Sequence, residues 1–157
     1  MRVKVFHGSR FEFEKINIYE SIDIGFHCGT LNQAITRVAD DTYYSSTLFQ
    51  NFIYEVNIDV NNSNTITLDD CIQWCDIKIL KKNLGIVGFD SSECKSLEEI
   101  RKKLISNGYE YIRYKNEVEG NGYSYILLTD NHKIKKHKIG DLFYRINNLL
   151  QTYEIIE

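Results

Sequence analysis

The stretch that most constrains the fold is residues 109–130, where two apolar runs flank an acidic, glycine-rich loop. Aromatic and β-branched residues dominate 109–114 and 123–128, which favours two strands. The loop carries Glu117 and Glu119, and side chains two residues apart in extended backbone point the same way. Such a carboxylate pair at a strand end can stabilise a positively charged sugar centre. Acidic residues next to Gly-Asn-Gly are also typical of a solvated hairpin loop, and this stretch alone favours that interpretation over the functional one.

Length and composition place the chain among ordinary globular proteins. Its 157 residues predict a single domain, 1–157, large enough for a substantial core. A net charge of -3 argues against sequence-independent nucleic-acid binding over the whole surface. The N-terminus favours a strand over a signal peptide, and no apolar run approaches the length of a membrane span. We therefore expect a cytoplasmic protein with no membrane partner.

The four cysteines predict neither disulfides nor a metal site. In an intracellular chain of this size they are expected to be free thiols. Cys71 and Cys75 have the spacing that seats two ligands on one helix face, but no His or third Cys lies near them in the sequence. We expect no bound metal.

Hydrophobic periodicity predicts short strands alternating with helices. Thr30 and Gln33 have the spacing of a capping box, and Ser96 is followed by Glu99 in the same way. The pattern over 66–80 favours a helix in which Trp74 packs into the core. The lysine-rich run at 133–138 favours an edge strand protected by its lysines, with a phosphate contact as the alternative. The predicted strands are 3–6, 24–28, 52–60, 109–114 and 123–128; the predicted loops and turns are 7–9, 10–23, 40–47 and 61–64; the predicted helices are 31–39, 66–80, one between Ser96 and Asn107, and 139–153.

Two histidines are predicted at strand ends. His7 precedes Gly8, and His27 lies just before a turn into a helix. A histidine beside a glycine at a strand end can meet a ligand with both its ring and the neighbouring backbone. The alternatives are a surface turn residue for His7 and a buried structural residue for His27.

Three segments, taken in order, resemble the ADP-ribosyltransferase fold, in particular its small prokaryotic and phage-type members. The resemblance runs from about Val3 to Ile134, is weak over 61–95, and depends on order, spacing and strand context more than on any one motif. The segments are Phe6-His7-Gly8-Ser9, then Gly25-Phe26-His27-Cys28-Gly29-Thr30 before a helix carrying Ala34 and Arg37, and Tyr114-Lys115-Asn116-Glu117-Val118-Glu119-Gly120 followed by Ser124-Tyr125-Ile126.

The resemblance implies an α+β fold of two small, mostly antiparallel sheets, with peripheral helices and a cleft that holds NAD as substrate. In the His-Tyr-Glu branch the first His binds the nicotinamide-side ribose and the next Gly holds the carboxamide, and His7 and Gly8 match these positions. His27 takes the place of the aromatic residue that stacks on nicotinamide, as in His-His variants such as the RNA 2'-phosphotransferases. Ser9 and Thr30 belong to the same implied NAD-binding set.

The implied catalytic residue is a glutamate. In polymerase-type members it opens the strand where this chain has Ser124, whereas in arginine-modifying toxins a Glu-x-Glu lies on the loop entering that strand. Glu117-Val118-Glu119 is similar to the second arrangement, with Glu119 expected at the ribose and Glu117 at the acceptor. Either the loop folds back to deliver Glu119, or the catalytic carboxylate is missing.

The resemblance thus implies transfer of ADP-ribose from NAD to a macromolecular acceptor, with release of nicotinamide. A protein acceptor is favoured over a nucleic acid. The alternatives are an RNA 2'-phosphotransferase or an NAD glycohydrolase on the same fold, and a non-catalytic binding module.

Overall fold

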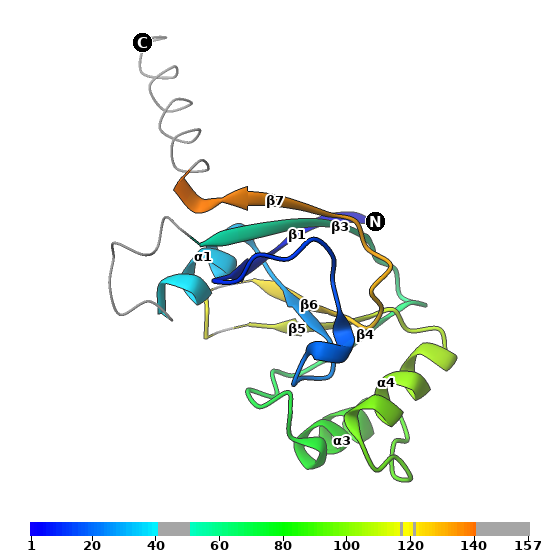
Figure 1. Cartoon of the computed structure of the whole chain (residues 1–157). Helices are drawn as coiled ribbons and strands as arrows, with labels where there is room; N and C mark the ends of the chain where they lie inside the picture. Colours follow the sequence, from blue (N-terminus) through cyan, green and yellow to red (C-terminus); the bar gives the residue numbers. More distant parts are fainter. Residues whose placement is uncertain (41–50, 117, 121, 141–157) are drawn as a thin grey trace, which may run out of the picture.

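The computed structural model describes residues 1–40, 51–116, 118–120 and 122–140. These residues form an α+β fold of two small, mostly antiparallel sheets and three α-helices, as predicted at this coarse level (Figure 1). Outside the described residues lie 41–47 of the loop predicted at 40–47, 141–153 of the helix predicted at 139–153, and Glu117.

The first sheet has the strand order β1-β3-β7, with both pairs antiparallel. Its strands are β1 (Arg2–Ser9), β3 (Phe52–Asp59) and β7 (Ile134–Lys138), so the lysine-rich edge strand is confirmed. The tight turn predicted at residues 7–9 was wrong. His7, Gly8 and Ser9 continue β1 because they pair with residues 52–54 of β3.

The second sheet has the order β2-β6-β5-β4. Its strands are β2 (Phe26–Cys28), β6 (Tyr123–Leu127), β5 (Tyr111–Lys115) and β4 (Thr65–Leu68). Only the β4–β5 pair is parallel. The predicted strand, loop and strand between residues 109 and 130 are therefore confirmed as β5, its following loop and β6.

The helix predicted over 66–80 was wrong in its first half. Ile66 and Leu68 alternate as strand residues in β4, and the helix α3 (Ile77–Ile86) begins only after Asp76, whose Oδ1 accepts from two backbone N–H groups. Cys71 and Cys75 therefore lie on a loop and do not share a helix face.

The other helices have the predicted local signals. In α4 (Leu97–Ser106), Ser96 caps the N-terminus and Asn107 ends the helix, followed by Gly108 at φ 90°. In α1 (Leu31–Asp40), the capping box is complete, because the Thr30 hydroxyl accepts from the Gln33 N–H at 3.1 Å and Gln33 Oε1 accepts from the Thr30 N–H at 2.8 Å.

The two larger clusters of the core form layers on either side of the second sheet, and a third, smaller cluster packs α1 against the first sheet. One layer fills the space between the sheets, and the other lies between the second sheet and the pair α3–α4, which Figure 1 shows together at one end of the molecule. The first layer includes Val5, Val56, Ile58, Tyr111, Tyr125 and Leu127, and the second includes Ile66, Ile112, Ile126, Leu80, Leu84, Ile100 and Leu104. None of the described helices is long and apolar enough to cross a membrane.

The two sheets are joined at their edge strands. Phe6 of β1 and Gly29, just after β2, exchange two backbone hydrogen bonds of 2.8 Å. Helix α1 packs over this junction so closely that a Cβ on Gly8 would lie 2.1 Å from the carbonyl oxygen of Ala34. Gly8 is therefore needed for close approach of the helix to the strand.

Candidate functional site

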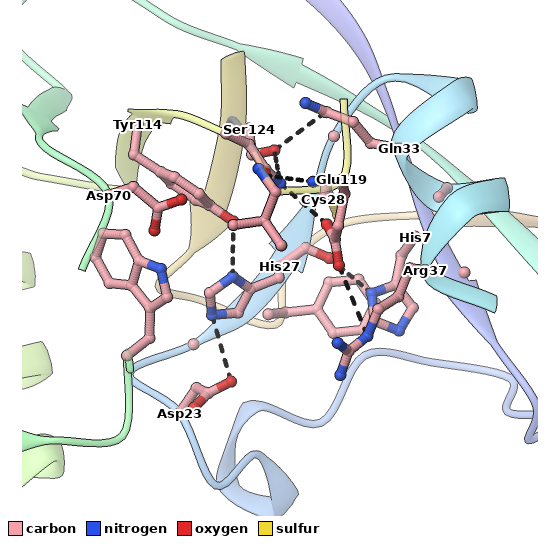
Figure 2. A pocket seen from close by; sticks show the side chains of 18 of the residues that line it. His7, Asp23, His27, Cys28, Gln33, Arg37, Asp70, Tyr114, Glu119 and Ser124 are labelled. Atoms are coloured by element: carbon pink, nitrogen blue, oxygen red, sulfur yellow. Dashed lines mark hydrogen bonds and ion pairs between the residues drawn. The ribbon is translucent and has the colours of Figure 1, made fainter. Parts of the chain in front are cut away.

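A pocket with a volume of about 410 Å³ opens at the junction of the two sheets. Its walls come from β1, β2, the first turns of α1, the loop after β4 and the loop after β5 (Figure 2). The volume lies in the range of small-molecule sites. Its ionisable lining groups are His7, Asp23, His27, Cys28, Arg37, Asp70, Cys75, Tyr114 and Glu119.

Four of the predicted site residues line this pocket: His7, Gly8, His27 and Glu119. Two do not. Ser9 forms a local turn, in which its hydroxyl donates to the Phe11 carbonyl and accepts from the Phe11 N–H. Thr30 instead caps α1 through its hydroxyl.

His7 is held as a neutral ring with a defined tautomer. Its Nδ1 lies 2.6 Å from the backbone carbonyl oxygen of His27, so Nδ1–H donates and Nε2 is left as the acceptor. The ring also lies 4.2 Å from that of Phe26, centroid to centroid. Burial, partly opposed by the hydrogen bond to His27, lowers the pKa of His7 to about 4. His7 therefore carries no charge at neutral pH.

His27 is also neutral. Burial lowers its pKa to about 3, with smaller contributions from His7 and Arg37. Nδ1 lies 3.2 Å from the hydroxyl of Tyr114, and the indole of Trp74 meets the imidazole edge to face, 5.9 Å between centroids. His27 Nε2 is buried and has no hydrogen-bond partner in the described part of the chain.

The loop after β5 folds back to bring Glu119 to the pocket. Asn116 sets its shape, because its Oδ1 accepts from the backbone N–H groups of Val118 and Glu119, each at 3.1 Å. The Asn116 side-chain amide donates to Glu119 Oε2 at 2.9 Å, and Arg37 Nε of α1 lies 3.8 Å from Oε1 (Figure 2). One carboxylate oxygen therefore accepts a hydrogen bond from an amide, and the other lies near a guanidinium.

Gln33 ties this loop to α1. Gln33 is only 1% exposed. Its side chain donates to the Gly120 carbonyl at 3.1 Å and accepts from the Ser124 hydroxyl at 3.1 Å. Ser124 in turn accepts from Asn116 at 3.1 Å. Gly120 and Gly122 have φ of 125° and 129°, which favours glycine. Ser124 thus supports the loop that carries Glu119.

Several lining residues escaped the sequence interpretation. Trp74 is 5% exposed and packs in the core as predicted, but on a loop, and it also forms a pocket wall. Gln33 was visible only as a capping residue. Asp23 lies in a stretch without periodicity, and no sequence signal could have selected it.

Two of the four cysteines, Cys28 and Cys75, line this pocket. All four cysteines are free thiols, and burial raises the pKa of Cys28 and Cys71. Among the residues that the structure describes, no group of three or more His, Cys, Asp or Glu side chains is placed to hold a metal ion.

Comparisons with protein-family models, curated proteins and solved structures found no match to this chain. The fold and the site by themselves define an α+β protein with a pocket of about 410 Å³, and among the described residues this pocket is lined by two neutral imidazoles, one guanidinium and three carboxyl groups.

Proposed function

We propose that the protein is an NAD-dependent ADP-ribosyltransferase that modifies a macromolecular acceptor and releases nicotinamide. One observation carries this proposal: His7, His27 and Glu119, from three separate segments, line a single pocket. Each has the residue type that ADP-ribosyl transfer requires at its place in the resemblance.

The histidines are suited to bind the nicotinamide riboside half of NAD. His7 donates through Nδ1, so its Nε2 can accept a hydrogen bond from a ribose hydroxyl. Neutral His27 can pack against the cationic pyridinium ring without charge repulsion, which a protonated imidazole would introduce. Arg37 supplies a positive charge for the diphosphate.

Glu119 supplies the transition-state stabilisation. As the bond between the ribose carbon and the nicotinamide nitrogen breaks, the electron pair leaves with nicotinamide and positive charge develops on the ribose. A fixed carboxylate stabilises this charge more than it stabilises neutral ribose, which lowers the barrier. An acceptor nucleophile then forms the new bond to the ribose carbon and loses its proton.

The proposal includes a protein acceptor and a cytoplasmic location. A protein acceptor is supported by the charge of the described lining, where Asp23, Asp70 and Glu119 oppose the single guanidinium of Arg37. Arg37 is therefore the one cation that the described lining offers to phosphate, and the proposal assigns it to the diphosphate of NAD, which leaves none for the backbone of a nucleic acid.

The deciding experiment measures nicotinamide release from NAD together with transfer of label from adenylate-labelled NAD to protein in a cell extract. Wild type should show both, and Glu119→Gln should lose both. Glu93→Gln, an exposed carboxylate outside the pocket, is the matched control.

Three other outcomes would replace the proposal. Nicotinamide release without labelled product would identify an NAD glycohydrolase. Removal of a 2'-phosphate from RNA in the presence of NAD would identify a 2'-phosphotransferase. NAD binding with no turnover would identify a non-catalytic binding module.

A further inference from the structure

Asp23 is a pocket carboxyl group that the proposed reaction does not use. Its Oδ2 lies 3.5 Å from His27 Nε2, and the two side chains are 31% and 25% exposed. Nε2 is the buried ring nitrogen that lacks a hydrogen-bond partner among the described residues. Figure 2 shows Asp23 and Tyr114 on opposite sides of the His27 ring.

The loop that carries Asp23 is fixed from two sides. Ser21 Oγ accepts from the Asp23 N–H at 3.2 Å and donates to the Gly25 carbonyl at 2.9 Å, which closes the turn. Behind it, buried Arg101 of α4 donates to the carbonyl oxygens of Ile18 and Ile24, each at 3.4 Å. The direction of Asp23 toward His27 is therefore set by the fold.

The other ring nitrogen faces a group that can either donate or accept. The Tyr114 hydroxyl lies 3.2 Å from Nδ1, and a phenol hydroxyl can take either role. A neutral imidazole carries its proton on only one nitrogen. The two tautomers of His27 therefore assign opposite roles to Tyr114.

The charge of Asp23 makes one of these two tautomers more favourable than the other. With the proton on Nε2, the N–H dipole points at the Asp23 carboxylate, and Nδ1 accepts from the Tyr114 hydroxyl. With the proton on Nδ1, the Nε2 lone pair faces the carboxylate, and this contact is repulsive. A carboxylate near one nitrogen commonly sets the tautomer of a histidine in this way.

We propose that Asp23 is a positioning residue that holds His27 in the tautomer with the proton on Nε2, and so makes the Tyr114 hydroxyl donate to Nδ1. The oxygen of Tyr114 then presents its remaining lone pairs to the pocket. The tautomer itself is independent of the proposed function, and only its effect on turnover rests on that function.

The test is heteronuclear NMR at neutral pH on protein labelled with nitrogen-15 in histidine, with His27→Gln used to assign the His27 signals. Wild type should show protonated Nε2 and unprotonated Nδ1. Asp23→Ala should shift His27 toward the opposite tautomer or a mixture. Glu20→Gln removes an exposed carboxylate nearby in the chain and should leave the tautomer unchanged.

The spectra decide the proposal in every case. A proton on Nδ1 in wild type overturns the proposal. An Nε2 tautomer that persists in the Asp23 variant overturns it as well, because the carboxylate then does not set the tautomer. A change of tautomer in Glu20→Gln also overturns it. If Asp23→Ala does not fold, Asp23→Asn replaces it, because its amide can donate to Nε2 and should also admit the opposite tautomer.

Nicotinamide release separates this proposal from the proposed function. If NAD is turned over, Asp23→Asn should lower kcat by more than about tenfold with little change in KM, because a wrong tautomer removes a productive hydrogen bond. Unchanged kcat would show that the tautomer has no catalytic effect and would overturn the positioning role. If wild type does not turn NAD over, the proposed function fails while the spectra still test the tautomer.

Discussion

The side-chain amide of Asn116, the residue directly after β5, donates to Glu119 Oε2 at 2.9 Å. The same residue accepts from the N–H groups of Val118 and Glu119, so one side chain both shapes the loop and holds its carboxylate. This relationship explains how a loop that leaves the sheet returns its acidic residue to the pocket.

Replacing Asn116 by Asp should separate these two roles. The carboxylate retains the acceptor for the two backbone N–H groups, but it removes the donor to Glu119 and places a like charge beside it. Hydrogen bonds to charged groups contribute about 1.5–3 kcal/mol, so nicotinamide release should fall by about tenfold to a hundredfold. The exposed Asn131→Asp is the control. Equal activity of the two variants would show that Asn116 does not position Glu119.

A pair of glycine variants should test the junction between the sheets. Gly8→Ala places a Cβ 2.1 Å from the Ala34 carbonyl oxygen, so α1 must move, and we expect a loss of about 1–3 kcal/mol in the free energy of unfolding. Gly85→Ala in α3 meets no atom within 4 Å and should gain about 0.5–1 kcal/mol. Urea denaturation measures both changes. A neutral Gly8→Ala would contradict the close packing of α1 on β1.

Local signals account for the parts of the fold that the sequence predicted. The Thr30–Gln33 capping box and the Ser96 cap involve residues three apart, so the chain encodes them without tertiary information. In contrast, Ile66 and Leu68 belong to a four-residue strand whose parallel partner, β5, lies more than forty positions away. A short apolar run of this kind cannot be assigned to strand or helix by periodicity alone.

The site was less predictable because most of its contacts are distant in sequence. His7, His27 and Glu119 could be selected by residue type and order, and the structure brings them to one pocket. Gln33 contacts Gly120 and Ser124, which are 87 and 91 positions away, and Asp23 faces His27 from a stretch without a pattern. Only the folded chain reveals these supporting contacts.

The two half-buried histidines predict a fall in stability on acidification. The pKa of His7 is lowered to about 4 and that of His27 to about 3, mainly by burial, from an ordinary value of 6.5. Below about pH 6.5 the unfolded chain binds protons that the folded chain does not, so unfolding becomes more favourable as the pH falls.

Each histidine should contribute a slope of up to about 1.4 kcal/mol per pH unit between its unfolded and folded pKa values. The free energy of unfolding, measured with urea at several pH values from about 7 to 4, should therefore decrease on acidification. His27→Gln should flatten this dependence, since glutamine does not titrate. A dependence that is the same in wild type and His27→Gln would show that His27 is not buried in the neutral form.

The two glutamates of the loop after β5 should have different roles. Glu119 lines the pocket, whereas Glu117 lies outside the described residues, and its assignment to the acceptor rests on the resemblance alone. Glu119→Gln removes the carboxylate proposed to stabilise charge on the ribose, so nicotinamide release should fall by about 10²–10³ in kcat.

Glu117→Gln should instead impair labelling of protein more than it impairs hydrolysis of NAD, because only transfer needs the acceptor to be oriented. Release of nicotinamide and transfer of label, measured in parallel for both variants, separate these effects. The opposite pattern would exchange the two roles, and loss of neither reaction in Glu119→Gln would exclude this carboxylate from the chemistry.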